Sequence, residues 1–440
     1  MLPNQTDVLV VGAGPVGMLT ALALAKNGLH VEVIDKEEQT AAHSHACVLH
    51  GRTLALLAQM GLADEVLARG RRIDRLAFYE GQTRHAELKF SELPGEFPFV
   101  VVLPQNDLED LLERRLGQQP RVGVHWSHRL ADLQDHGGRV VATIDKLCET
   151  SKGYPVATWQ HVVEKKINID AAFVVGADGR ESQVGQVMKI ERDVVGSPEY
   201  FAVFEFESDA ELANEIRIVL DDKTANLFCP LPGNRGRWTF QIAPEELSYD
   251  AHLKDRLHAR VIDPQEDEQV MREMYRLIGQ RAPWFDAHVT EVAWFTVIAF
   301  ERRLARQYGL RRCWLAGDAA HSTSPLGMQS MNVGLCEGAE LAHAMTAAVR
   351  QKALPDVLAA YDVHCRDEWR QLLGLERSVI ATSSALAWTR LRSARLLSCV
   401  PASGDDLAHL FRQIGLALEP LARAKESLAL RSVELATDDL

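Results

Sequence analysis

The sequence is poor in cysteine, glycine and proline, and each shortage argues against a class of protein. Its 440 residues include seven cysteines, an odd number that are scattered without a CxxC pair. Disulfide-stapled secreted domains usually carry an even, closely spaced set, so we expect reduced thiols and a cytoplasmic location. The 29 glycines and 17 prolines are too few for a collagen-like chain or one made mainly of linkers.

Positive charge is also in short supply. The 48 lysines and arginines are outnumbered by 61 aspartates and glutamates, which gives a formal net charge of −13. We expect no nucleic acid partner, because such binding depends on basic surface that neutralises phosphates. Hydrophobic residues make up 47% and charged residues 25%, as in a soluble globular protein with a large core. At ~150 residues per domain, the length allows about three domain-sized units.

No uninterrupted hydrophobic run predicts a membrane span. Residues 8–25 carry no charge and reach the lower edge of membrane-span length. Glycines and a proline break this run near its middle, and no lysine or arginine precedes it. We therefore expect neither a membrane span nor a signal peptide at the start of the sequence.

The first 35 residues instead predict a strand, a glycine turn, a helix and a second strand. Residues 7–11 (DVLVV) are mainly apolar and rich in β-branched side chains, and GAGPVG follows at 12–17. A helix-forming stretch then ends at Gly28, and residues 30–35 return to a strand pattern. This order is a βαβ unit.

The glycines of this unit form the pattern GxGxxG, in which each has a physical role. Gly12 permits the tight turn, Gly14 lets a pyrophosphate approach the backbone, and Gly17 lets the helix pack on the strand. The helix N-terminus would attract phosphates, and Asp35 would accept hydrogen bonds from a ribose. An isolated GxGxxG pattern is sometimes no more than a tight turn between a strand and a helix. Within a complete βαβ unit it predicts a dinucleotide site.

The rest of the chain mixes helix and strand patterns. Helices are expected at residues 52–60, at 106–117 with Asn106 as the cap, and at 328–349. Short strands are expected at 139–144, 166–169 and 171–176, and antiparallel strands at 200–206, 216–220 and 237–242. The last ninety residues show leucine, alanine and arginine at helical spacing, so a helical C-terminal region is expected.

Two further turns join glycine to an acid directly after an apolar strand. They are Gly176–Gly179 and Gly317–His321. An aspartate at a strand end is commonly a turn or helix cap, but three such turns in one chain favour a nucleotide site. Beyond the second of them, residues 325–332 precede the long helix, and their amides could face an electron-rich ring.

Over about residues 5 to 350 the sequence resembles the p-hydroxybenzoate hydroxylase family, the single-component FAD-dependent aromatic hydroxylases. Four motifs match in the family's order: GAGPVG with Asp35, LPQNDLEDLL with Gln105, GADGRES, and GDAAHSTSPLGMQSMN. The resemblance implies an α/β fold with a Rossmann-like FAD-binding domain, an inserted β-sheet substrate domain and C-terminal helices. The FAD-binding domain would comprise residues 1–70, 98–180 and 285–350, the substrate domain 71–97 and 181–284, and the helical region 351–440.

The resemblance also implies which residues meet the cofactor. The first turn with Asp35 would hold the ADP half of FAD, Gln105 would lie by the flavin, and Asp318 would bind the ribityl chain. Asp178 and Gly179 would serve both FAD and the nicotinamide cofactor, and the loop with Pro325 and Gly327 would border the flavin ring and the oxygen site as its catalytic part. The expected cofactor-binding residues are Gly12, Gly14, Pro15, Val16, Gly17, Asp35, Lys36, His45, Arg52, Gln105, Asp178, Gly179, Gly317, Asp318, Pro325, Gly327, Met328, Gln329, Ser330, Met331 and Asn332.

Several positions depart from the family's pattern. His45 stands where an arginine that meets the cofactor's phosphates is common, and Glu337 stands where aspartate is common. The family's GGQG is replaced by Gly327-Met328-Gln329-Ser330, so two glycines beside the expected ring have become larger residues.

Other chemistries find less support in the sequence. His43, His45 and His50 lie near Cys47, but no carboxylate or second cysteine nearby completes a tetrahedral set, so no metal is expected. No GxSxG elbow supports a serine hydrolase. Several aromatic side chains could line a substrate pocket or pack as ordinary strand core; they are Phe204, Phe206, Trp238, Phe240 and Trp294.

The expected reaction follows from the resemblance. NADH or NADPH would reduce FAD, O2 would add to give a C4a-hydroperoxyflavin, and this would hydroxylate a small electron-rich aromatic substrate that is phenolic, polyketide-like or quinolone-like. No second GxGxxG unit is evident, so the nicotinamide cofactor would bind transiently on the surface of the FAD domain. The protein would be a monomer or homodimer. A flavoprotein oxidase, dehydrogenase or epoxidase on the same scaffold, and a non-catalytic flavin-binding protein, stay open as alternatives.

Overall fold

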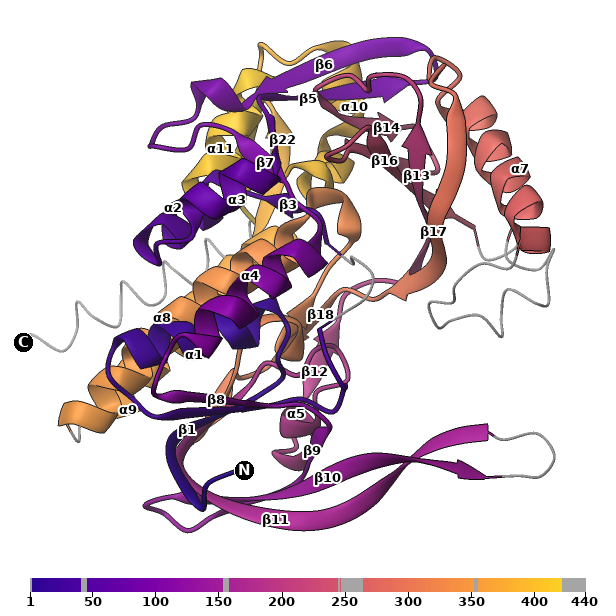
Figure 1. The fold of residues 1–440 in the computed structure, drawn as a ribbon. Helices are drawn as coiled ribbons and strands as arrows, with labels where there is room; N and C mark the ends of the chain where they lie inside the picture. The colour runs from indigo at the N-terminus through magenta and orange to yellow at the C-terminus, as the bar shows by residue number, and fades with distance from the viewer. Residues whose placement is uncertain are drawn as a thin grey trace, which may run out of the picture.

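The structure is a computed structural model that describes residues 2–40, 46–152, 158–243, 246, 264–351 and 355–421. Figure 1 shows two sheets joined by several crossings of the chain, with helices around the first and a C-terminal segment that reaches the second. Within the described residues, no helix combines the length and the apolar character that crossing a membrane would require.

The first sheet carries the βαβ unit. Its main path runs in the order β19 (Gly309–Leu310), β20 (Cys313–Leu315), β11 (Thr158–Gly176), β1 (Gln5–Val11), β2 (Val31–Ile34) and β8 (Val122–His125). The strands from β20 to β8 are parallel neighbours. The sheet lies among α1 (Pro15–Lys26), α4 (Gln105–Gly117), α8 (Gln329–Gln351) and α9 (Pro355–Leu372), and residues 8–11 of β1 are fully enclosed. An apolar strand buried on both faces is typical of a parallel sheet.

A long hairpin extends from this sheet. It is formed by β10 (Val140–Lys152) and β11, with β9 (His128–Asp135) beside β10 (Figure 1). The sequence predicted three short strands between 139 and 176, and that prediction was wrong in length. The antiparallel pairing continues from Val140 opposite Ala171 to Lys152 opposite Thr158, because one register irregularity after Lys146 absorbs the break in the alternation.

The second sheet has seven strands. Their order is β17 (Val289–Phe300), β13 (Glu199–Ser208), β16 (Arg235–Ile242), β15 (Ala225–Pro230), β14 (Ile216–Leu220), β5 (Arg75–Glu80) and β6 (Thr83–Lys89). All neighbours are antiparallel except β14 and β5, so the antiparallel strands expected here are confirmed. Helix α7 (Pro264–Arg281) covers one face. The core under it contains Phe204, Phe206, Trp238 and Phe240, which therefore pack as strand core.

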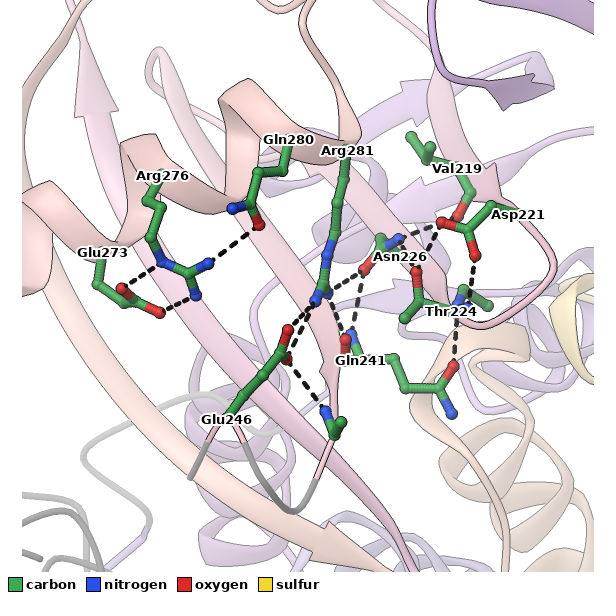
Figure 2. Close-up of polar contacts among 12 residues, drawn as sticks. Val219, Asp221, Thr224, Asn226, Gln241, Glu246, Glu273, Arg276, Gln280 and Arg281 are labelled. Atoms are coloured by element: carbon green, nitrogen blue, oxygen red, sulfur yellow. Dashed lines mark hydrogen bonds and ion pairs between the residues drawn. The ribbon is translucent and has the colours of Figure 1, made fainter. Parts of the chain in front are cut away.

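A polar network fastens α7 to this sheet (Figure 2). Arg281, at the end of the helix, donates to Asn226 Oδ1 at 2.9 Å and to the Gln241 carbonyl, and its guanidinium lies 3.2 Å from Glu246 Oε2. Asn226 is fully buried, and its amide donates to the Val219 carbonyl at 3.2 Å. The network thus joins the helix to the strands β14, β15 and β16.

Smaller elements connect the sheets. The strands are β3 (Val48–Leu49), β4 (Arg71–Ile73) and β7 (Val100–Val102) in one sheet, and β12 (Arg192–Val194), β18 (Arg303–Ala305) and β21 (His321–Ser322) in another. The helices are α2 (Gly51–Gln59), α3 (Ala63–Arg69), α5 (Gln183–Val187), and the short 3-10 turns η1 (Phe90–Glu92), η3 (Gly317–Ala319) and η4 (Pro325–Gly327).

Two helix starts differ from the sequence-based expectation. Helix α4 begins at Gln105 and is preceded by Pro104, so Asn106 lies inside the helix and is not its cap. Helix α8 begins at Gln329, because Met328 has a left-handed backbone with φ 51° and cannot be a helical residue.

The C-terminal segment contains strands as well as helices. After α9 come β22 (Arg377–Ala381), α10 (Ala387–Leu396), η5 (Leu397–Cys399), α11 (Gly404–Gln413) and β23 (Leu416–Pro420). The antiparallel pair β22–β23 was not expected, because its two short strands are far apart in sequence and neither shows a strong strand pattern alone. Residues 422–440 of the expected helical region lie outside the described residues.

Candidate FAD-binding site

The three glycine–acid turns meet at one edge of the parallel sheet. Val11 of β1 pairs with Ile34 of β2 and with Gly176 of β11, and Gly176 pairs with Leu315 of β20. Each strand therefore ends at the same level, and the turn that follows it lies at the carboxyl edge. Parallel α/β sheets bind their ligands in the crevice outside this edge.

The first turn is shaped by close backbone approach. Gly12 has φ +107°, and a Cβ atom there would lie 2.2 Å from the Ala177 carbonyl oxygen, while one on Gly17 would lie 1.9 Å from the Gly12 carbonyl oxygen. Around Gly14 no described atom lies within 4 Å of the place a Cβ would take. Open space beside Gly14, at the start of a helix that no described side chain caps, fits a phosphate group.

Asp35 is held by the turn that it faces. Its Oδ2 accepts from the Ala13 amide at 2.6 Å and its Oδ1 accepts from the Glu37 amide at 2.9 Å. A carboxylate has about four acceptor sites, so two stay available for ribose hydroxyls. The neighbouring Lys36 is exposed and lies 3.9 Å from Glu37.

Asp178 at the second turn bonds the start of helix α5, whose N-cap is Ser182. It accepts from the Ser182 hydroxyl at 2.6 Å and from the Val184 amide at 3.1 Å, at the start of α5. Burial raises the pKa of its carboxyl, and these hydrogen bonds act in the opposite direction. Next to it Gly179 has φ +74° and open space where a Cβ would lie.

Asp318 at the third turn differs from the other two acids. Its side chain is accessible, yet so much protein surrounds it that restricted solvation raises the pKa of the carboxyl. An accessible carboxylate with many protein neighbours fits a ligand that supplies hydroxyl donors.

Glu337 holds the third turn in place. Its Oε2 accepts from the Gly317 amide at 3.0 Å and binds His321 Nε2 at 2.8 Å, and its Oε1 accepts from Trp369 Nε1 at 2.8 Å and from the Tyr308 hydroxyl at 3.2 Å. The sequence analysis noted Glu337 only as a departure from the family's pattern. The sequence analysis missed this role because Glu337 lies 20 residues after Gly317 in the chain.

The loop after the third turn is fixed by two amide side chains. Gln329 donates to the carbonyls of Val400 at 3.3 Å and Ala402 at 3.2 Å. Asn332 accepts from the His50 amide at 2.8 Å and donates to the Val48 carbonyl at 2.8 Å.

Half-buried side chains remain for contact with a ring, and they are Pro325, Met328, Ser330 and Met331. A Cβ at Gly327 would lie 2.9 Å from the Ser398 carbonyl oxygen, so close packing is a second reason for a glycine at this position.

Three other expected cofactor residues come from separate segments. Gln105 accepts from the Ala46 amide at 3.1 Å and donates to Glu109 at 2.7 Å. The exposed Arg52 donates to Glu368 on α9 at 2.5 Å and to the Ser403 hydroxyl at 3.3 Å. His45 lies outside the described residues, as does His43.

A row of buried polar side chains crosses the second sheet on the face opposite α7. Trp294, Glu205, Arg237 and Cys229 are direct cross-strand partners on β17, β13, β16 and β15. Arg237, only 3% exposed, donates to Glu205 at 2.6 Å, and its guanidinium lies 5.8 Å from the centre of the Trp294 ring. Sequence reasoning missed Glu205 and Arg237, because only strand register brings them together.

This row lies beside the expected ring loop. Strand β15, which carries Cys229, contacts η4. The buried ion pair and the predicted flavin loop are therefore linked through the strands β16 and β15.

Comparison with known proteins agrees with this geometry. The model of a family described as "FAD binding domain" matches residues 5–375. A 6-methylpretetramide 4-monooxygenase from Streptomyces rimosus is 28% identical over 401 residues, which cover 89% of this chain and 64% of that protein. An aromatic compound monooxygenase from Bacillus subtilis is 30% identical over 358 residues, covering 81% and 64%. The chain thus spans less than two thirds of the length of these relatives.

A solved structure shares the fold. The crystal structure of p-nitrophenol 4-monooxygenase from Pseudomonas putida superposes with a TM-score of 0.70, covering 93% of this chain and 94% of that one at 21% identity. The resemblance found in the four motifs and the expected α/β fold are confirmed. The chain belongs to the FAD binding domain family, whose cofactor is FAD.

Proposed function

We propose that the protein is an FAD- and NAD(P)H-dependent monooxygenase that hydroxylates a small electron-rich aromatic substrate, phenolic or polyketide- or quinolone-like. The observation that carries this proposal is the buried Arg237–Glu205 pair beside the ring loop. The names of the relatives, which include monooxygenases of a polyketide and of aromatic compounds, support it.

The Arg237–Glu205 pair points to a chemical role because it adds little to folding. A buried ion pair gains little over apolar packing of the same volume, since both charges lose their hydration. Arg237 keeps its charge at any ordinary pH and offers several N–H donors. A guanidinium in this position would bind the oxygen of a phenolate and favour the ionised, electron-rich form of the ring.

The chain's own part in the reaction is binding, orientation and exclusion of water. When bound, FAD supplies the transfer of two electrons from NAD(P)H and of one oxygen atom from O2. The first turn and Asp318 would hold the nucleotide and ribityl parts, and the loop with Pro325 and Gly327 would present amides to the ring. Arg237 is itself only 3% exposed, so its surroundings would keep water from the reacting atoms.

An arginine cluster near the second turn suits the nicotinamide cofactor. Arg192 donates to the carbonyls of Arg180 at 3.1 Å and Ala319 at 2.8 Å. Burial lowers the pKa of Arg192, and the positive charge of Arg303 lowers it further. Arg180 and Arg303 both pair with Glu301, so the charge of the cluster is partly neutralised. We infer that NADH or NADPH binds here transiently, because the arginines supply N–H donors for its phosphates. The proposal includes a cytoplasmic location and a monomer or homodimer.

Isotope incorporation tests the reaction. FAD-loaded protein is screened with phenols, quinones, quinolones and polyketide-like aromatics for stimulated NAD(P)H oxidation, and products made under 18O2 are analysed by mass spectrometry. One labelled oxygen in the product is the expected result. Flavin reduction without incorporation would identify an oxidase or dehydrogenase, and no reduction with any compound would identify a non-catalytic flavin-binding protein.

Arg237→Lys tests the role of the guanidinium. Lysine keeps the charge but loses the forked donors, and a hydrogen bond to a charged group is worth ~1.5–3 kcal/mol, so KM for phenols should rise roughly 10- to 150-fold. Arg235→Lys is the control, because Arg235 also contacts Glu205, at 3.4 Å, from the same strand. FAD content should stay unchanged in both variants. Equal KM values in both would contradict the assignment.

A further inference from the structure

A glutamate, a histidine and a cysteine meet where two helices pack against each other. Helices α8 and α9 are neighbours (Figure 1), and Glu340 belongs to α8, while His364 and Cys365 belong to α9. A carboxylate oxygen, a ring nitrogen and the sulfur of these three residues all lie within 4.8 Å of one another. We call this set the α8–α9 group. It differs from the histidines near Cys47, because Glu340 and His364 lie 24 residues apart in the chain and only helix packing brings them together.

The three side chains already face one another and lie at different depths. His364 Nδ1 is 2.9 Å from Glu340 Oε2, and their side chains are 55% and 38% exposed. Cys365 is only 2% exposed. The α8–α9 group therefore has its sulfur on the inner side and is open to solvent on the other side. An ion from solution can reach it, and a water molecule can occupy a fourth coordination position.

The donor atoms of the α8–α9 group select a class of metal ion. Proteins bind zinc through cysteine sulfur, histidine nitrogen and carboxylate oxygen, usually with four ligands in a tetrahedron. Magnesium and calcium prefer oxygen ligands, and one carboxylate among three donors offers them too little. With ordinary zinc–ligand bonds, the ligand atoms of a tetrahedron are roughly 3.3–3.8 Å apart. The observed separations of at most 4.8 Å therefore require only small shifts of the side chains.

A second set of residues shows what the buried sulfur adds. Glu38, Glu149 and His161 also bring three donor atoms within 4.8 Å, but all three residues are exposed and none offers sulfur. Glu149 and His161 are cross-strand partners on the hairpin of β10 and β11. Water competes for each of these exposed donors, so this set serves as the matched comparison for the α8–α9 group.

We propose that Glu340, His364 and Cys365 form a zinc site that joins α8 to α9. The glutamate binds the ion through a carboxylate oxygen, and the histidine binds it through a nitrogen of its neutral ring. The cysteine binds as a thiolate, and its proton passes to solvent as the ion enters. A water molecule completes the tetrahedron on the exposed side.

The site would strengthen the support of the third glycine–acid turn. Trp369 of α9 donates to Glu337 at 2.8 Å, and Tyr361 of α9 donates to the Leu315 carbonyl at 2.8 Å. Helix α9 thus holds both the strand that leads into the turn and the glutamate that binds it. An ion that binds only the folded chain stabilises it, so the zinc-loaded protein should melt at a higher temperature than the zinc-free protein.

Metal analysis of the FAD-loaded protein tests the site. The protein is stripped with a chelator, dialysed against zinc under reducing conditions and assayed for bound metal, and a single zinc ion per chain should remain. X-ray absorption should find sulfur at about 2.3 Å from the zinc and nitrogen or oxygen at about 2.0–2.2 Å. Magnesium in excess should not displace the zinc, because the donor set suits it poorly.

His364→Ala is the principal variant, because His364 is exposed and its replacement should leave the fold intact. Loss of a residue that only supports a metal ligand costs roughly 10- to 100-fold in affinity, so loss of a ligand should weaken zinc binding at least 100-fold. Cys365→Ser should also weaken binding and should remove sulfur from the absorption spectrum. His161→Ala, which removes an exposed histidine of the comparison set, should keep full affinity and the full rise in melting temperature.

Several results would overturn the proposal. They are an unsubstituted protein that retains no zinc, equal affinity in that protein and His364→Ala, bound zinc without a sulfur ligand, and loss of binding in His161→Ala. The first would leave Glu340 and His364 as a simple ion pair between two helices. All three ligands belong to α8 and α9, so the inference does not rest on the proposed function. Zinc binding without aromatic hydroxylation would refute the proposed function alone, and hydroxylation without zinc binding would refute the inference alone.

Discussion

At the scale of single residues, three aspartates in similar turns do different work. Asp35 and Asp178 each accept two hydrogen bonds from nearby protein groups, whereas Asp318 stays accessible. A carboxylate bonded by its own turn spends part of its acceptor capacity on shaping the backbone. A carboxylate such as that of Asp318, which stays accessible, can bind a ligand. All three aspartates follow a glycine in similar turns, so the sequence pattern alone does not distinguish these roles.

Asp318→Ala should weaken FAD binding without costing stability. Loss of a charge-assisted bond to a ribityl hydroxyl is worth ~1.5–3 kcal/mol, or roughly 10- to 150-fold in Kd. The protein around Asp318 raises the pKa of its carboxyl, so folding disfavours the ionised form relative to the unfolded chain, and the FAD-free protein should melt no lower after the substitution. Fluorescence titration with FAD and thermal melts of both forms measure the two effects.

Glu337→Ala provides the contrast. It leaves the Gly317 amide, His321, Tyr308 and Trp369 without their shared acceptor, so the FAD-free protein should melt at a lower temperature. If Asp318→Ala instead lowers only the melting temperature and keeps full FAD affinity, Asp318 is a turn residue.

At the scale of elements, the sequence predicted those helices and strands whose signals lie within a short stretch of the chain. The βαβ unit was readable because glycine spacing, helix formers and β-branched runs all agree within 35 residues. The hairpin of β10 and β11 was read too short, since polar residues interrupt the apolar pattern while strand pairing continues past them. The strands β22 and β23 depend on each other across α10 and α11, and no short window of sequence contains both.

The attachment of α7 to the second sheet depends on Arg281 (Figure 2). Arg281→Met should lower the free energy of unfolding by about 1–3 kcal/mol, because Asn226 Oδ1 and the Gln241 carbonyl lose a buried donor. Arg276→Met is the control, since Arg276 is exposed and bonds only Glu273 and Gln280 on its own helix among the described residues. Urea unfolding should separate the variants, and equal midpoints would show that apolar packing alone fastens the helix.

At the scale of the whole molecule, the sequence predicted the cofactor side of the candidate site but not its substrate side. The cofactor side is predicted by motifs that are contiguous in sequence, and the match to an FAD binding domain confirms the cofactor. The substrate side depends on the register of four strands, which places Trp294, Glu205, Arg237 and Cys229 in one row. A slip of one residue would turn each side chain to the other face, so composition and spacing could not find this row.

The C-terminal segment fastens both sides of the site together. Gln329 in the ring loop donates to the carbonyls of Val400 and Ala402. Arg392 on α10 donates to Glu80 of β5 and to Asp222 in the turn between β14 and β15, each at 2.6 Å. A single segment therefore contacts the loop beside the expected flavin and the far edge of the substrate sheet (Figure 1).

Arg392→Met should loosen this fastening across the molecule. Glu80 would keep its bond from Trp388, at 2.6 Å, but would lose its cationic partner, at a cost of about 1–3 kcal/mol. Amide hydrogen exchange in α10 and η5 should quicken, and exchange in the ring loop should follow, because Gln329 bonds the carbonyls just after η5. Arg390→Met, which removes an exposed arginine from the same helix, should change neither. Faster exchange confined to α10 would show that the loop is held independently, and FAD retention should then equal that of the unsubstituted protein.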